Sequence, residues 1–137
     1  MRNLFITGGA GYAASYLIEG EKIGIVVGTG VGAPTPTDYA LGTKIAHGNG
    51  AGQFEYGGNE VLPLVYAAPN VSFTIRRYFT NNSGGAITVN EAGIYAEISS
   101  NIVAEFAACI ARDLVSPGVA VANTELLRVS YVPQITV

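Results

Sequence analysis

Glu91 and Glu97 are the acidic residues whose spacing comes nearest to a catalytic pair, because they stand six residues apart in one β-type segment. A glycoside hydrolase needs two carboxyl groups about 5 to 10 Å apart, one acting as acid and the other as base or nucleophile. Alternation along a strand puts both side chains on one face, but the strand rise separates them by about 20 Å. This pair is therefore excluded as a glycosidase site.

Cys109 and His47 are the single cysteine and the single histidine of the chain. They exclude an intramolecular disulfide and a His/Cys cluster for zinc or a redox metal. A carboxylate-only Ca²⁺ or Mg²⁺ site stays open, although the 10 acidic residues show no ligand spacing. We interpret Cys109 as an inert core residue and His47 as a hydrogen-bonding surface residue. The chain is accordingly expected to have no catalytic residue, no metal and no cofactor.

A glycine-rich segment near the N-terminus could approach a nucleotide. An apolar run leads into Thr7-Gly8-Gly9-Ala10-Gly11, with Ala14 in the place of a third glycine. This segment resembles the opening of extended short-chain dehydrogenases and sugar-nucleotide epimerases, whose glycines let a pyrophosphate approach a helix N-terminus. Residues 12–18 are too few for the crossover helix, which needs about a dozen residues. Gly28 stands where that family has its ribose-binding acid. A dinucleotide-binding enzyme fragment is therefore a remote alternative, beside a flexible arm or an inter-subunit turn.

Composition excludes two further classes of partner. The net charge is −3, and the basic residues are spread singly apart from Arg76-Arg77, so no basic stripe is available for a phosphate backbone. No apolar run approaches the roughly 18 residues of a membrane span. We also recognise no secretory signal in the sequence. Neither nucleic acid nor a membrane is expected as a partner, and a small-molecule ligand is not favoured.

The low charge of the chain predicts a homo-oligomer. Charged residues make up 12% of the chain, against about 25% in an average soluble protein. The apolar fraction is 49% and the mean hydropathy is +0.34. So few charges do not cover the surface of a monomer, and we expect part of the surface to be buried against other subunits.

The pattern of the chain predicts an all-β fold. Its 18 glycines and 6 prolines fall mostly between β-branched and aromatic runs. We predict an antiparallel, jelly-roll-like β-sandwich as a single domain over residues 22–137, preceded by an N-terminal arm over residues 1–21. A long Gly/Pro-rich loop is expected over 29–52. Strands are expected at 22–27, 53–56, 61–66, 71–80, 87–98, 103–112 and 126–132.

The segment from Ser72 to Glu91 predicts a hairpin with a structural ion pair. Two alternating runs flank a turn formed by Asn81, Asn82, Ser83, Gly84 and Gly85. Pairing across this turn places Arg77 opposite Glu91, which gives the hypothesis of a half-buried Arg77–Glu91 pair. A register shifted by one residue, with Arg77 reaching solvent past the sheet edge, is the alternative. Neither alternative makes this charge catalytic.

Residues 103–112 fit two elements. Val103, Phe106 and Ile110 recur at helical spacing, yet Phe106, Ala108 and Ile110 also alternate as in a strand. We predict a strand, because Ser99-Ser100-Asn101 has turn composition and a sandwich needs a partner strand here.

A series of blocks extends from Ile25 to the C-terminus. They read IVVGTG (25–30), APTPTDYAL (33–41), IAHG (45–48), GQFEYG (52–57), FTNNSGGAITVNEAGIY (79–95), ARD (111–113) and VAVAN (119–123). In order and wording these blocks resemble a family of small virion structural proteins of tailed bacteriophages. The resemblance implies a β-sandwich subunit without enzymatic activity, made in the host cytoplasm and located in the virion. Its implied partners are copies of itself and other virion proteins, in the capsid exterior (decoration), the neck or the tail.

The second function that we consider is a receptor- or glycan-binding module of a tail fibre. Aromatic platforms for sugars would come from Tyr12, Tyr16, Tyr39, Tyr56 and Tyr66, although cross-strand packing is the commoner role of tyrosines in β proteins. The arm and the long loop are expected to reach a neighbouring subunit. Residues 133–137 either end the sandwich or add a strand to a neighbour.

Overall fold

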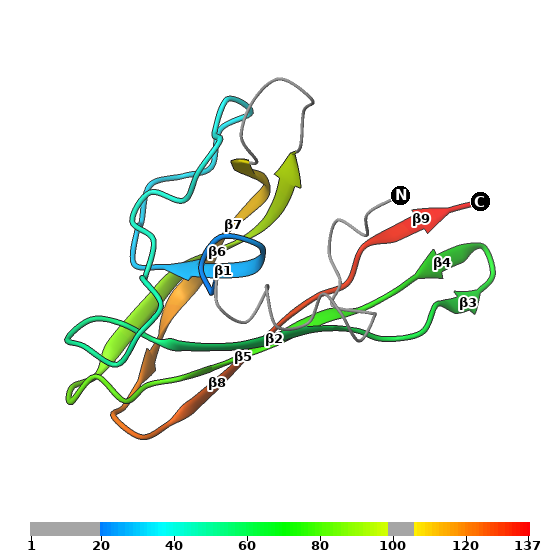
Figure 1. Ribbon diagram of the computed structural model, residues 1–137. Coiled ribbons are helices and arrows are strands. Elements are labelled where there is room, and N and C mark those ends of the chain that lie inside the picture. Colours follow the sequence, from blue (N-terminus) through cyan, green and yellow to red (C-terminus); the bar gives the residue numbers. More distant parts are fainter. Residues whose placement is uncertain (1–19, 99–105) are drawn as a thin grey trace.

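The structure is a computed structural model that describes residues 20–98 and 106–137 (Figure 1). Within these ranges the chain is all-β and its strands pair antiparallel, which confirms the predicted sandwich-like fold class. The strands are β1 (Gly24–Gly28), β2 (Glu55–Val61), β3 (Val65–Ala67), β4 (Asn70–Ser72), β5 (Ile75–Thr80), β6 (Ile87–Ile98), β7 (Phe106–Val121), β8 (Leu126–Tyr131) and β9 (Gln134–Thr136). The strand that we predicted at 103–112 is confirmed over 106–112, and residues 103–105 lie outside the described ranges.

Two three-stranded sheets form the body of the molecule. One has the order β1-β6-β7 and the other β2-β5-β8. Alternation in β5 buries Ile75, Arg77 and Phe79 and leaves the residues between them half-buried. Phe79 packs edge-on against Tyr56 of β2, with ring centroids 4.8 Å apart. Side chains of both sheets and of the loop between β1 and β2 join one hydrophobic core.

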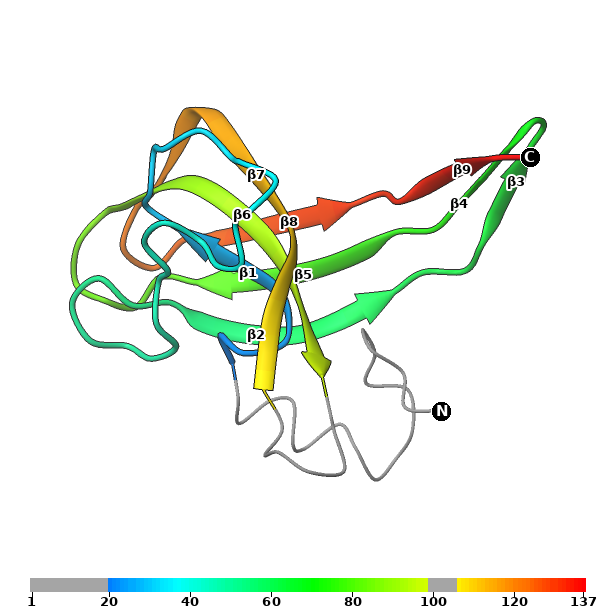
Figure 2. The ribbon, with the colours of Figure 1, turned by 90° about the horizontal axis from the view of Figure 1, so that it is seen from above.

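A third sheet extends the second one beyond the body. Along the chain, β3 follows β2, β4 precedes β5, and β9 follows β8. The third sheet therefore has the order β3-β4-β9, which repeats the order β2-β5-β8 of the second sheet. The Leu62 N–H bonds to the Thr74 carbonyl, and the Phe73 N–H to the Pro133 carbonyl, across the two junctions. We call residues 62–74 and 132–137 the blade. It projects away from the body in both views (Figures 1 and 2).

The predicted hairpin over 72–91 is wrong. β5 pairs with β2 and β8, whereas β6 pairs with β1 and β7, so residues 81–86 cross from one sheet to the other. Asn81 is fully buried at this corner, and its side-chain amide donates to the carbonyls of Gly85 and Val121, both at 2.8 Å. Its backbone also bonds to residues 124 and 125 at the corner between β7 and β8. The predicted turn residues 81–85 therefore form part of an inter-sheet corner. The hairpin prediction failed because turn-forming residues alone do not distinguish a hairpin from a crossing between sheets.

The predicted Arg77–Glu91 pair is wrong for the same reason. Arg77 lies opposite Asn59 and Val129 in one sheet, while Glu91 lies opposite Gly28 and Leu114 in the other. Arg77 is 0% exposed, so the alternative in which it reaches solvent is also wrong. Each of the two charges has hydrogen-bonding partners that are distant in sequence.

Candidate interaction surface

Glu91 of β6 holds the long loop against the first sheet. Its carboxylate is completely buried and accepts hydrogen bonds from the N–H groups of Gly30 (3.0 Å), Gly42 (2.9 Å) and Thr43 (2.7 Å) and from Nε of Arg112 (2.9 Å). Burial would raise the pKa of Glu91, but these hydrogen bonds hold the pKa below its ordinary value. An anionic carboxylate with four donors acts as a clamp, whereas a general acid needs a raised pKa.

Arg112 of β7 extends this clamp to the tip of the loop. Its guanidinium forms ion pairs with Glu91 and Asp38 and donates to the Gly32 carbonyl at 2.8 Å. The N–H and the hydroxyl of Thr35, followed by the guanidinium, lower the pKa of Asp38 to about 2. The close approach also explains Gly30, because a Cβ there would lie 2.4 Å from Oε1 of Glu91. The loop over 29–43 is thus fastened by buried charge.

Arg77 joins the two sheets through backbone carbonyl groups. From β5 its Nη1 donates to the carbonyls of Ile23 (3.0 Å) and Ile25 (2.9 Å), and its Nε donates to Gly57 (2.6 Å). The guanidinium carbon lies 4.8 Å from the centroid of the Tyr56 ring. Burial lowers the pKa of Arg77 to about 10, so the side chain remains a cation at neutral pH.

The outer edge of β1 is closed by the chain itself. Asn59 of β2 accepts the Ile25 N–H at 3.0 Å and donates to the Ile23 carbonyl at 3.3 Å, as a neighbouring strand would. Further along the edge, the Val27 carbonyl accepts the Ile45 N–H at 3.0 Å. Together with Arg77, these contacts occupy the groups that an added strand would need.

Cys109 and His47 take part in local contacts. Cys109 is half-buried, its thiol donates to the Ala111 carbonyl at 3.1 Å, and burial raises its pKa, which favours the unreactive thiol form. His47 is exposed, and its Nδ1 accepts the Tyr56 N–H at 3.1 Å.

The tyrosines proposed as sugar platforms are not gathered together. Tyr56 is buried, while Tyr39 in the loop and Tyr66 in the blade are 81% and 69% exposed. The loop and the blade lie at opposite ends of the molecule (Figures 1 and 2). Tyr12, Tyr16 and the glycine-rich segment 7–14 lie outside the described residues, so the structure says nothing about that motif.

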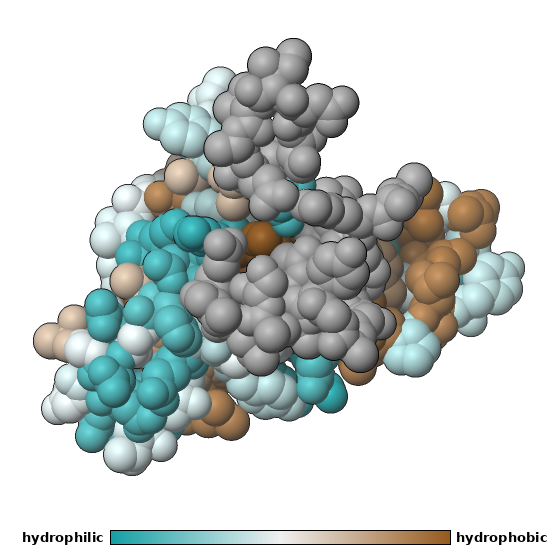
Figure 3. Space-filling view, viewed as in Figure 1, coloured by the Kyte–Doolittle hydropathy of each residue, from teal (hydrophilic) through white to brown (hydrophobic). Residues whose placement is uncertain are grey.

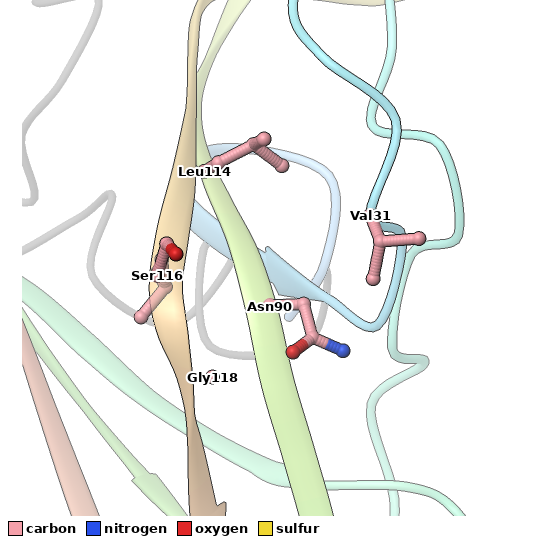
Figure 4. A pocket seen from close by; sticks show the side chains of 6 residues that line it. Val31, Asn90, Leu114, Ser116 and Gly118 are labelled. Atoms are coloured by element: carbon pink, nitrogen blue, oxygen red, sulfur yellow. The ribbon is translucent and has the colours of Figure 1, made fainter.

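A small pocket opens where β7 bulges away from β6. The pairing passes from Val89 with Val119 directly to Glu91 with Leu114, so β7 has extra residues opposite Asn90. The pocket is lined by Val31, Asn90, Leu114, Val115, Ser116 and Gly118 and has a volume of about 150 Å³ (Figure 4). Ligand pockets usually exceed about 300 Å³, and no charged side chain lines this one, so it supports no ligand.

Over 20–98 and 106–137, no three His, Cys, Asp or Glu side chains are grouped so as to hold a metal ion. No helix in those ranges is long and apolar enough to span a bilayer.

The blade carries a row of apolar side chains on one face. The strand register places Tyr66 opposite Val71 and Val71 opposite Ile135, so the three share a face. Tyr66 is 69% and Ile135 62% exposed, and the apolar residues Leu64, Val132 and Val137 of the blade are exposed as well. In Figure 3 brown, apolar residues lie at this end of the molecule, interspersed with pale teal ones. We call Tyr66, Val71 and Ile135 the apolar row.

The blade is also uncharged in its side chains. No Asp, Glu, Lys or Arg occurs in residues 61–75 or after Arg128. The face opposite the apolar row carries Val65 and Ala67 beside neutral polar side chains, and there the Thr136 hydroxyl donates to the Asn70 side chain at 2.9 Å. This surface was not predicted from the sequence, although the two segments without charged side chains were a signal for it. A continuous exposed apolar patch on a small protein is typical of an interaction site.

The fold and this surface define the class: an all-β, sandwich-like protein with an exposed apolar blade. No family model matches the chain, and no match was found among curated proteins or solved structures.

Proposed function

We propose that this chain is a non-enzymatic structural subunit that assembles with copies of itself and with other proteins in the virion of a tailed bacteriophage. The observation that carries the proposal is the apolar, uncharged blade, which leaves Tyr66 and Ile135 exposed beyond a well-packed body. Apolar area of this kind is stabilised when a partner covers it.

The chemistry of the body supports the same role. Its buried charges, Glu91, Arg112 and Arg77, are occupied in fastening the loop and joining the sheets. None of them is aimed into the small pocket beside Asn90. A rigid body with an apolar extension suits a building block. The assignment to a phage particle is supported by the resemblance of the blocks over 25–123 to virion proteins of tailed phages. The proposal does not choose among the capsid exterior, the neck and the tail as the location of the subunit in the particle.

Light scattering of the purified chain over a wide concentration range tests self-assembly. We expect a discrete oligomer whose mass and melting temperature are unchanged by NAD⁺. A monomer at every concentration would contradict self-assembly, and a melting temperature raised by NAD⁺ would favour a dinucleotide-binding protein. Mass spectrometry of purified particles of the phage that encodes the chain tests the virion: we expect its peptides in stoichiometric amounts, and their absence would refute a virion role.

A receptor- or glycan-binding tail-fibre module is the second candidate, favoured by the exposed rings of Tyr39 and Tyr66. Tyr39 belongs to the loop and Tyr66 to the blade, which lie at opposite ends of the molecule (Figures 1 and 2). Each ring would therefore have to act alone. Binding on a glycan array that is lost in Tyr39→Ala or Tyr66→Ala would favour this module over a purely structural subunit.

A further inference from the structure

We propose that the apolar row, Tyr66, Val71 and Ile135, is the surface on which a second copy of this chain docks. This inference rests on the proposed function and deepens it, because it assigns the contact to one face of the blade.

The blade is poorly supported by its own chain. Its strands β3, β4 and β9 each have three residues, and those of β3 and β9 are exposed throughout. A small sheet needs a covered hydrophobic face for stability. The apolar row is the face that a cover would bury, since all three of its residues are apolar, whereas the opposite face mixes Val65 with polar side chains such as Asn70 and Thr136.

The absence of charge points to a second copy as the cover. A charged partner surface would lose its hydration against the apolar row and meet no charged side chain in residues 61–75 or 129–137. Surfaces of the body expose charged groups, for example the Arg76–Glu60 ion pair on β5 and β2. Within this chain, the surface that can cover the apolar row without burying charge is therefore the apolar row of a second copy.

The geometry also suits self-pairing. A twofold axis brings the same patch of two subunits face to face, so an apolar row meets an apolar row. The outer edge of β1 is closed by Asn59 and Arg77, which removes one competing site for strand addition. Docking through the face of the blade leaves the body and its loop unchanged.

The test compares the masses of wild type and two blade variants, Tyr66→Lys and Ile135→Lys, by light scattering across concentrations. Each variant places a charge in the row, so we expect the dissociation constant to rise at least about tenfold. Tyr39→Lys is the matched control, because Tyr39 is at least as exposed as Tyr66 but lies in the loop; its mass should equal that of wild type. Circular dichroism verifies the fold, and Ile135→Ser replaces any lysine variant that does not fold.

The outcomes separate this inference from the function on which it rests. An oligomeric wild type with equally oligomeric blade variants overturns the docking surface but leaves self-assembly intact. A wild type that is monomeric at every concentration overturns both. Hydrogen exchange of wild type supplies a second readout: protection of residues 65–67 and 134–136 should rise with protein concentration. Protection that does not depend on concentration would overturn the second copy in favour of a cover from the same chain, such as residues 1–19.

Discussion

The body and the blade use side chains in opposite ways. The body buries charge: Glu91 and Arg77 are 0% exposed, and each is surrounded by hydrogen-bonding groups from segments far away in sequence. The blade has no charged side chain and exposes its apolar ones, Tyr66 and Ile135 among them. The partners described for Glu91 and Arg77 thus come from within one chain. The exposed apolar side chains of the blade, by contrast, contribute stabilisation only when another surface covers them.

This difference separates stability from assembly. Removing one partner of a buried polar contact leaves the other without compensation, which is among the costliest changes in a folded protein. Replacing an exposed side chain costs the monomer little. Substitutions in the body should thus change the free energy of unfolding, and substitutions in the blade should change the association constant.

The largest effect is expected from Arg77→Met, which keeps the length of the side chain but removes the donors to Ile23, Ile25 and Gly57. Two buried carbonyls and a partly buried one lose a partner, so the free energy of unfolding should fall by about 3 to 5 kcal/mol. Urea denaturation, monitored under conditions where wild type and variant have the same mass, measures it. Tyr66→Ser in the blade is the control and should change the free energy by less than about 0.5 kcal/mol. Equal losses in both variants would erase the distinction between body and blade.

Glu91→Gln should follow, with a loss of about 2 to 4 kcal/mol. The neutral amide weakens the contact with Arg112, and its NH₂ group faces a backbone N–H of the loop, where only an acceptor fits. Hydrogen exchange should show the loss of protection concentrated in residues 29–43. Glu60→Gln breaks the exposed pair with Arg76 and should cost at most about 1 kcal/mol. Uniform exchange over the whole chain would indicate that Glu91 does not act on the loop in particular.

Sequence reasoning succeeded where the signal is local. Alternation from Ile87 to Ile98 predicted β6 with both of its ends, and turn composition predicted the long irregular loop before β2. Residues 103–112 were predicted to form a strand because a sandwich needs a partner strand there, although the periodicity of the segment was ambiguous. The prediction was confirmed over 106–112. Residues 133–137 were left between two alternatives, and β9 pairs with β4 of its own chain.

The errors arose where partners are distant in sequence. The turn after Thr80 was assigned to a hairpin because five turn-forming residues stand together. In the structure Asn81 is buried and bonds to residues 124 and 125 at the corner, and the chain passes from there into the other sheet. Glu91 was assigned to Arg77, whereas it binds Arg112 and the N–H groups of Gly30, Gly42 and Thr43. Backbone donors leave no mark in a sequence, so this clamp could not be read from residue types. The uncharged run 61–75 was readable, and it marks the surface that we assign to assembly.

Acid should weaken the clamp of the loop. The pKa values of Glu91 and Asp38 lie below their ordinary values of 4.5 and 3.8, that of Asp38 at about 2. The unfolded chain therefore binds more protons than the folded one in this range, so this stabilisation is present in full above about pH 5 and is lost as the pH falls through the folded values. Melting temperatures measured from neutral pH to about pH 2 should fall. The fall should be smaller in the double variant Asp38→Asn/Glu91→Gln, and parallel curves would mean that other carboxylates govern the acid response.

The smallest effect is expected at the corner between β7 and β8. Thr124 has a φ of 72°, a left-handed conformation that is unfavourable for a β-branched residue by roughly 1 to 2 kcal/mol. Asn tolerates this conformation better, and its backbone still donates the 2.6 Å hydrogen bond to the Asn81 carbonyl. Thr124→Asn should therefore raise the free energy of unfolding by about 0.5 to 1 kcal/mol, whereas Thr88→Asn, the same change at an exposed position of β6, should lower it slightly because Asn is disfavoured in strands. Neither variant should alter the mass of the oligomer, since both positions belong to the body; a change in mass with Thr124→Asn would mean that the corner, and not only the blade, takes part in assembly.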